Sequence, residues 1–128
     1  MPGTLDERVV TGERPHKYHA KPTVVDGIRF ASQKEVRRYG ELKLLEKAGK
    51  IFRLALQPRY RLCAFTNRPN EEPRAIGYYV ADFRYCNHAG CLCAWGCQIE
   101  DVKGMKTPLY RWKKKHVEAQ YGIRIREI

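Results

Sequence analysis

Two short stretches of this chain place acidic residues and a lysine within otherwise apolar sequence. They are residues 78–83, which contain Asp82, and residues 99–104, which contain Asp101 and Lys103. Because side chains two apart in an extended strand share one face, Asp101 and Lys103 are expected to point the same way. If the two stretches pair, Asp82 lies beside them. Two carboxylates and a lysine on rigid strands are the minimum needed to bind a divalent cation and hydrolyse a phosphodiester.

The composition favours a nucleic-acid partner. Among 128 residues, 25 are Lys or Arg and 14 are Asp or Glu, which gives a formal net charge of +11. Such a charge attracts polyanions through counterion release, although it does not distinguish DNA from RNA. No apolar run approaches the ~20 residues of a membrane span, and the N-terminus lacks the pattern of a signal peptide. We therefore expect a cytoplasmic protein with no membrane association.

Turn and capping signals divide the chain into the elements that would position these residues. Residues 1–22 mix charges with prolines and glycines, which predicts a flexible basic arm before a single domain at 23–128. The Asp-Gly pair at 26–27 lies between β-branched runs and predicts a hairpin. Ser32 then fits the N-cap of a helix, and Glu35 falls where a capping box would use it.

The first helix is expected to end at Gly49, and its apolar residues at three-residue spacing predict one buried face. These residues are Val36, Tyr39, Leu42, Leu45 and Ala48. A strand or extended connection follows at 51–57, and strands are expected at 59–65, 75–85, 97–103 and 123–128.

A second helix is predicted from the N-cap Thr107 to Tyr121, with Pro108 at its first position. Its expected packing surface consists of Leu109, Trp112, Val117 and Tyr121. The element order is α-β-β-β-α-β after the N-terminal hairpin, with a cysteine-rich β-hairpin tip before the strand at 97–103.

This order, together with four short motifs, resembles the PD-(D/E)XK nuclease superfamily, and within it small phage and prophage proteins. The motifs are Phe-x-Ser-x-x-Glu at 30–35, Gln-Pro at 57–58, Asp-Phe at 82–83 and Glu-Asp-x-Lys-Gly at 100–104. The resemblance covers about residues 17–128. It implies an α/β, restriction-endonuclease-like core, in which helices flank a central mixed sheet.

The resemblance also implies a catalytic set, Glu35, Asp82, Asp101 and Lys103, that uses Mg²⁺ or Mn²⁺. Asp82, Asp101 and the carbonyl oxygen of Val102 would hold the metal ion. Lys103 would orient the attacking water or help to deprotonate it. Glu35 would reach the site from the first helix, through a water or a second metal ion.

Each of these residues also has a purely structural interpretation. Glu35 can serve the capping box alone. Asp82, Asp101 and Lys103 could form an ion pair across a hairpin, although two buried acids against one lysine leave uncompensated charge that a cation would remove. Glu100 lies on the opposite face from Asp101 unless a bulge shifts the register.

A run of basic residues follows Lys103 with no acid before Glu118. The members expected to contact DNA phosphates are Lys106, Arg111, Lys113 and Lys114. Lys113 is expected nearest the active site, because similar proteins carry a lysine there. The alternative is an ordinary solvated helix face.

Four of the five cysteines lie close together in the sequence. Cys86, Cys91, Cys93 and Cys97 could hold a structural Zn²⁺. No Cys-x-x-Cys pair occurs among them, so the alternative is that they are small apolar residues of a long hairpin.

The resulting hypothesis is a Mg²⁺-dependent endonuclease from a phage or prophage that acts on DNA in a bacterial host cell. So small a chain offers no separate recognition domain, which favours selection of a DNA structure, such as a junction or branch, over a long base sequence. A homodimer is expected, because one small active site cuts one strand. The alternative is a non-catalytic nucleic-acid-binding module with a basic helix and a zinc-stabilised hairpin.

Overall fold

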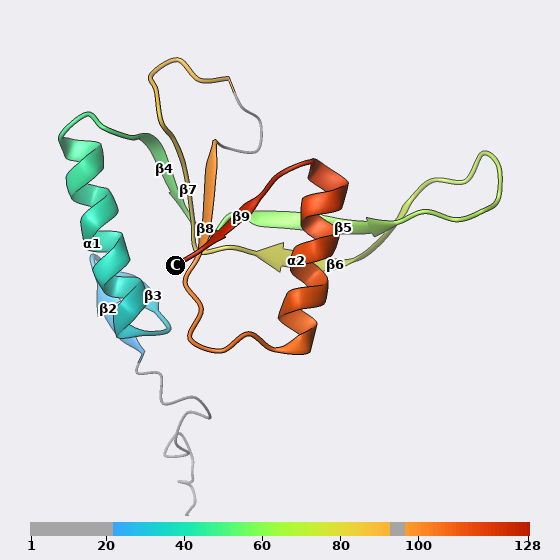
Figure 1. The fold of residues 1–128 in the computed structure, drawn as a ribbon, viewed down its shortest axis with the longest axis horizontal. Helices are drawn as coiled ribbons and strands as arrows, with labels where there is room; N and C mark the ends of the chain where they lie inside the picture. The colour runs from blue at the N-terminus through green and yellow to red at the C-terminus, as the bar shows by residue number, and fades with distance from the viewer. Residues whose placement is uncertain (1–21, 93–96) are drawn as a thin grey trace, which may run out of the picture. The chain divides into compact units, whose positions relative to one another are not determined.

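The computed structural model describes residues 22–92 and 97–128 (Figure 1). These residues fall into two compact units, one ending at Val36 and one running from Arg37 to Ile128, whose positions relative to each other are not determined. The expected flexible arm lies almost wholly outside the described residues, and the single-domain expectation for 23–128 stays a prediction. Neither helix in the described part of the chain combines the length and apolar character needed to cross a membrane.

The first unit contains the predicted hairpin. Strands β2 (Thr23–Val25) and β3 (Ile28–Phe30) pair antiparallel. The turn residues Asp26 and Gly27 have φ angles of 54° and 76°. Two successive positive φ values are what a two-residue type I′ turn requires, so the Asp-Gly signal is confirmed.

Helix α1 (Gln33–Lys47) begins in the first unit and continues into the second. Its start follows the capping prediction, because the Ser32 hydroxyl accepts a hydrogen bond from the Glu35 N–H at 3.2 Å. The helix ends just before Gly49, whose φ of 76° suits the left-handed residue that closes many helices.

The predicted buried face of α1 is only partly right. Tyr39 and Leu42 are buried, whereas Leu45 and Ala48 are exposed. A step of three residues falls about 60° short of a full turn at 3.6 residues per turn. Five residues at this spacing therefore spiral around the helix, and the last two leave the packed side.

The second unit contains a four-stranded mixed sheet in the order β4-β7-β8-β9. Its strands are β4 (Phe52–Leu56), β7 (Phe83–Cys86), β8 (Gln98–Asp101) and β9 (Ile125–Glu127). Strands β4 and β8 each pair antiparallel with β7, and β9 pairs parallel with β8. A separate ribbon of β5 (Arg59–Ala64) and β6 (Arg74–Val80) extends away from this sheet (Figure 1). The mixed α/β class is thus confirmed.

The predicted single strand at 75–85 is wrong, because the chain changes sheets in its middle. Residues before Ala81 belong to the β5–β6 ribbon, and those after Asp82 belong to the four-stranded sheet. At the crossing, the Ala81 N–H donates to Pro58 and the Asp82 N–H donates to Glu100. Alternation along the sequence continues through such a bend, so the pattern alone does not reveal it.

Helix α2 (Pro108–Tyr121) has the predicted ends. The Thr107 hydroxyl accepts a hydrogen bond from the Tyr110 N–H at 3.1 Å, and Gly122 has a φ of 66°. Its packing surface differs from the prediction, because Leu109 and Trp112 are 61% and 57% exposed.

The core lies between α2, the β5–β6 ribbon and one face of the four-stranded sheet. Its buried members are Tyr60, Leu62, Tyr79, Ala81, Ile99, Tyr110, Val117 and Ile125. Tyr110 and Val117 are seven positions apart, so they form one stripe on α2, where the prediction named Leu109 instead of Tyr110.

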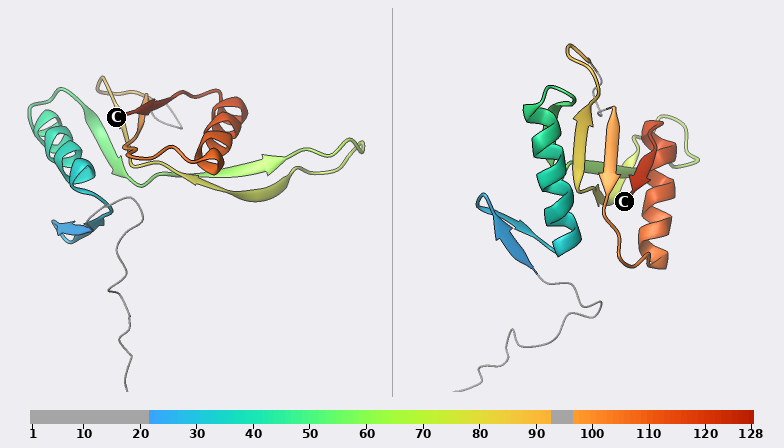
Figure 2. Two further views of the ribbon diagram at one scale, coloured as in Figure 1. Left: turned by 60° about the horizontal axis from the view of Figure 1, so that its bottom comes forward. Right: turned by 60° about the vertical axis from the view of Figure 1, so that its left-hand side comes forward.

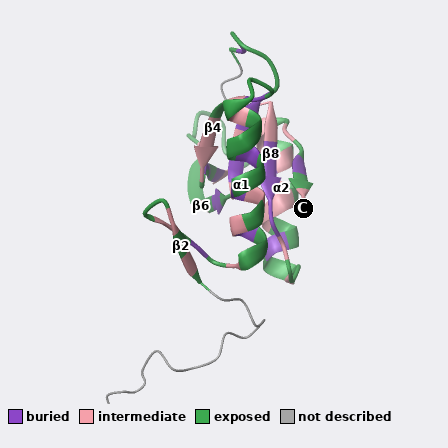
Figure 3. Ribbon diagram, turned by 90° about the vertical axis from the view of Figure 1, so that its left-hand side faces the viewer, coloured by how far each residue is buried: buried purple, intermediate pink, exposed green. Residues whose placement is uncertain are grey.

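Strand β8 is buried from both sides (Figure 3). Ile99 faces the core described above, while the neighbouring Glu100 is hydrogen-bonded to Arg38 of α1. Because successive strand residues point to opposite faces, α1 and α2 cover opposite sides of the sheet (Figure 2).

Candidate active site

Asp101 and Lys103 meet where β8 ends. Asp101 is the last residue of the strand and is 1% exposed. The ammonium nitrogen of Lys103 lies 3.2 Å from Asp101 Oδ1. The two side chains therefore lie together, as their two-residue spacing predicts.

The two oxygens of Asp101 have different surroundings. Oδ2 accepts a hydrogen bond from the Tyr79 hydroxyl. Burial and the adjacent carboxylate raise the pKa of Tyr79, so this phenol remains a donor. Oδ1 is buried and accepts no hydrogen bond from the described residues, with the Lys103 ammonium as a nearby cation. Asp101 thus offers one oxygen to a further ligand.

Asp82 is held against the same end of β8. Its Oδ2 accepts a hydrogen bond from the Val102 N–H at 2.6 Å, directly after Asp101. Its backbone N–H donates to the Glu100 carbonyl at 3.0 Å, and its own carbonyl accepts from the Gln57 N–H at 2.9 Å. Three of the four sequence motifs therefore converge where the chain changes sheets.

A surface pocket of about 300 Å³ opens beside these residues. Asp101, Lys103 and Lys113 contribute to its lining, together with Tyr79 and Tyr110. The Lys103 ammonium lies 4.6 Å from the centre of the Tyr110 ring, a cation–π distance. Lys113 donates to the Tyr78 carbonyl at 3.1 Å. The pocket thus combines a buried acid with two lysines, which suits a metal ion and an anionic substrate.

Glu35 belongs to the first unit, on α1, and it is 7% exposed. The structure does not relate it to the acids of the second unit. Its N–H donates a hydrogen bond to the Ser32 hydroxyl, and its catalytic role stays a prediction.

Two of the other predicted DNA-binding residues, Lys106 and Lys114, lie beside the acid Glu127, which no sequence motif indicated. Lys106 lies 3.0 Å from Glu127, and Lys114 lies 3.8 Å from the same carboxylate. Hydrogen bonds from Lys106 and Tyr110 lower the pKa of Glu127. Arg111 is exposed on α2. Lys106 and Lys114 are thus partly neutralised, and of the predicted DNA-binding residues Lys113 is the one that lines the pocket.

Glu100 forms a separate network on the other face of β8. Arg38 binds it with two hydrogen bonds, from Nε at 2.7 Å and from a terminal nitrogen at 2.6 Å, and Tyr85 donates a third. Burial raises the pKa of Glu100, but these hydrogen bonds and the charges of Arg38 and Arg126 outweigh it and lower the pKa. Strand alternation predicted the orientation of Glu100, but no sequence pattern named Arg38 as its partner.

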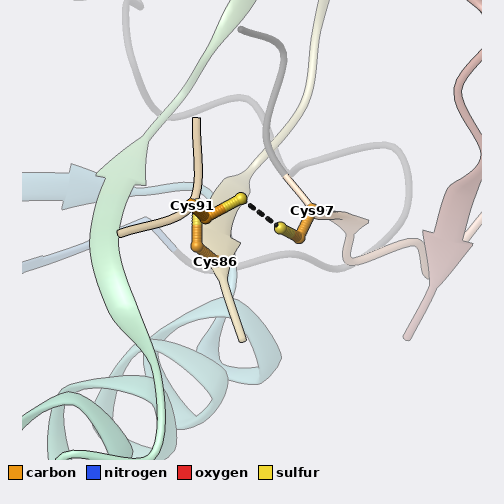
Figure 4. Close-up of side chains that lie close together, drawn as sticks. All are labelled: Cys86, Cys91 and Cys97. Carbon is orange, nitrogen blue, oxygen red and sulfur yellow. Dashed lines mark hydrogen bonds between the residues drawn. The ribbon is translucent and has the colours of Figure 1, made fainter. Parts of the chain in front are cut away.

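Three cysteines cluster at the opposite end of β8 (Figure 4). Cys86 ends β7, Cys97 directly precedes β8, and Cys91 lies between them. Their sulfur atoms all lie within 4.8 Å of one another, and those of Cys91 and Cys97 are 2.9 Å apart. This set of thiols could bind a metal ion such as zinc. Cys93, the fourth predicted ligand, lies outside the described residues.

Comparison with curated proteins found no match, and comparison with solved structures found none either. A family model, described as "Protein of unknown function (DUF1064)", matches residues 15–126. This match spans most of the sequence, and the chain therefore belongs to the DUF1064 family.

Proposed function

We propose that this protein is a metal-dependent endonuclease of restriction-endonuclease-like fold that hydrolyses DNA phosphodiester bonds. The observation that carries the proposal is the buried Asp101 carboxylate, whose Oδ1 accepts no hydrogen bond from described residues and faces the Lys103 ammonium at 3.2 Å. Burying a charged oxygen that accepts no hydrogen bond is costly, and a bound cation would offset that cost.

The donor set fits a hard divalent ion such as Mg²⁺ or Mn²⁺. Asp82 and Asp101 supply carboxylate oxygens at one strand end, and Val102 adds a backbone carbonyl, all of the type that Mg²⁺ prefers. When bound, such an ion would polarise the scissile phosphate and activate water. Tyr79 would hold the Asp101 carboxylate in place through its hydrogen bond to Oδ2.

The two lysines of the pocket would act on the substrate. Lys103 and Lys113 line it together with Asp101, so a phosphate bound there would meet two positive charges. Lys103 is close enough to Asp101 to position a water between the acid and the phosphate. The basic residues of α2 would neutralise phosphates of the DNA backbone, which would add affinity without selecting a base sequence.

The proposal extends to a phage or prophage origin, selection of branched or junction DNA, and a homodimer that cuts both strands. The alternative is a non-catalytic nucleic-acid-binding module. The buried acid disfavours this alternative, since a protein that only binds phosphate gains nothing from a carboxylate in the binding pocket.

The test is cleavage of linear, supercoiled, single-stranded, flapped and four-way-junction DNA with Mg²⁺ or Mn²⁺. Asp101→Asn, Asp82→Asn and Lys103→Met should each reduce cleavage at least about 100-fold, the usual scale for removing a catalytic group. Glu72→Gln and Lys50→Met, at exposed positions away from the pocket, are the charge-matched controls. Circular dichroism of each variant checks its folding.

Absence of cleavage by the wild type on every substrate would refute the proposal, as would Asp101→Asn cleaving as fast as the wild type. DNA binding in a gel-shift assay without cleavage would favour the non-catalytic alternative.

A further inference from the structure

We propose that Cys86, Cys91 and Cys97 bind one Zn²⁺ ion, which fastens the connection between β7 and β8. This site is separate from the proposed nuclease centre, and its ligands are thiols instead of carboxylates. Zinc in proteins favours thiolate ligands and tetrahedral coordination.

The sheet brings these cysteines together although their spacing in the sequence is not that of a zinc knuckle. Strands β7 and β8 pair antiparallel, with Tyr85 opposite Gln98. One residue further along this register, Cys86 stands opposite Cys97. Cys91 returns to the same place from the connecting segment, and both Cys86 and Cys91 are buried.

The positions of the sulfur atoms suit zinc. A tetrahedral site with Zn–S bonds of about 2.3 Å places its sulfurs about 3.8 Å apart. The three sulfurs here lie within 4.8 Å of one another, and the shortest separation, between Cys91 and Cys97, is 2.9 Å. Shifts of about 1 Å, within the reach of a cysteine rotamer, would accommodate the ion.

Strand β4 supports two of the ligands. Phe52 pairs with Cys86, and the register of β4 shifts just after it. At this irregularity Arg53 has a φ of 60°, a left-handed conformation that is unfavourable for a non-glycine residue. Its guanidinium donates a hydrogen bond to the Cys91 carbonyl. The Arg53 guanidinium thus lies beside the segment that carries Cys91. Its positive charge would offset the net negative charge of three thiolates around one Zn²⁺.

A disulfide between Cys91 and Cys97 is the competing interpretation. It would use two of the three thiols and would give no role to the buried Cys86. Zinc accounts for all three, and for the cation that Arg53 brings beside them.

The test is the zinc content of the full chain, purified under reducing conditions and exchanged into metal-free buffer. Wild type should retain about one equivalent, and Cys86→Ser, Cys91→Ser and Cys97→Ser should each lose it. Cys63→Ser is the matched control, because Cys63 lies in β5, outside the cluster, and it should retain zinc as the wild type does.

A second measurement uses only the wild type, so it does not depend on whether the cysteine variants fold. Wild type stripped of metal by a chelator should take up Co²⁺ with the ultraviolet charge-transfer bands of thiolate ligands, and Zn²⁺ should displace it and raise the melting temperature. The proposal fails if the wild type holds neither ion. It also fails if mass spectrometry finds a Cys91–Cys97 disulfide in the native protein, or if Cys63→Ser loses the metal as the cluster variants do. None of these readouts involves DNA cleavage, so they are independent of the proposed nuclease activity.

Discussion

Replacing Arg38 by methionine tests the network that holds β8 from the α1 side. Glu100 has a fully buried side chain, and Arg38 donates two hydrogen bonds to it. Breaking a buried ion pair by removing one partner typically costs 3–5 kcal/mol, because the other charge remains buried. Tyr85 still donates to Glu100, and Arg126 lies 3.7 Å from it. We therefore expect a loss at the low end of that range, about 3 kcal/mol.

A double-mutant cycle separates the interaction energy between Arg38 and Glu100 from the packing energy of the two side chains. Arg38→Met with Glu100→Leu replaces the two charges by apolar groups, an exchange that is often nearly neutral. The double variant should thus recover at least half of the stability lost in Arg38→Met. Glu100→Leu alone should be milder than Arg38→Met, since Arg38 is 17% exposed and its charge can reach solvent.

The assay for this cycle is urea unfolding followed by circular dichroism, with the same zinc content in all four proteins. If Arg38→Met lowered the free energy of unfolding by less than about 1 kcal/mol, the reasoning would be wrong, because Glu100 would then be compensated by other groups when Arg38 is absent. A double variant less stable than Arg38→Met would refute the reasoning as well.

Three further predictions concern single groups. The pKa of Glu100 is lowered in the folded state, so its stabilising effect is present above the unfolded value near 4.5 and is lost as the pH falls through the folded value. Urea midpoints at pH 7 and pH 4 should therefore differ less in Glu100→Gln than in the wild type, and an equal or larger difference would contradict this. Thr107→Ala should cost about 1 kcal/mol by removing the N-cap of α2, whereas Thr107→Ser should cost much less; equal unfolding midpoints for the two would argue against the cap. Tyr79→Phe should cost about 1–3 kcal/mol, because it removes the hydrogen bond to buried Asp101, and a variant as stable as the wild type in urea would mean that this contact contributes nothing.

Local signals in the sequence predicted the ends of elements well. Asp26 and Gly27 predicted the hairpin turn, and Thr107 predicted the start of α2, because turns and caps depend on residues adjacent in the chain. The proximity of Asp101 and Lys103 was also predictable, because it requires only the alternation of a single strand.

Features that depend on distant partners were not predictable. Ala81 and Asp82 mark the point where one alternating run passes from the ribbon to the four-stranded sheet, and only the pairing partners reveal this change. The exposure of Trp112 has the same origin, because the neighbours of α2 determine which of its apolar residues are covered. The cysteine cluster was predictable in part. A pairing of β7 with β8 was anticipated, and its register would have placed Cys86 opposite Cys97.

The adjacent acids Glu100 and Asp101 make the register of β8 critical. Because side chains alternate, a slip of one residue would turn Glu100 toward the pocket and Asp101 toward Arg38. Separate contacts oppose such a slip along the strand. The Arg38 hydrogen bonds fix Glu100 in the middle, and the pairing with β9, with the Ile128 N–H donating to the Asp101 carbonyl at 3.0 Å, fixes the end.

The proposed zinc site would fix the beginning of the same strand. Cys97 and Asp101 are four residues apart, which corresponds to about 14 Å of extended chain. This separation is too long for a metal ion bound by the thiols to touch a phosphate held at Asp101. Loss of zinc should therefore lower the stability of the protein and, if the nuclease proposal holds, reduce activity only to the extent that β8 loses its register.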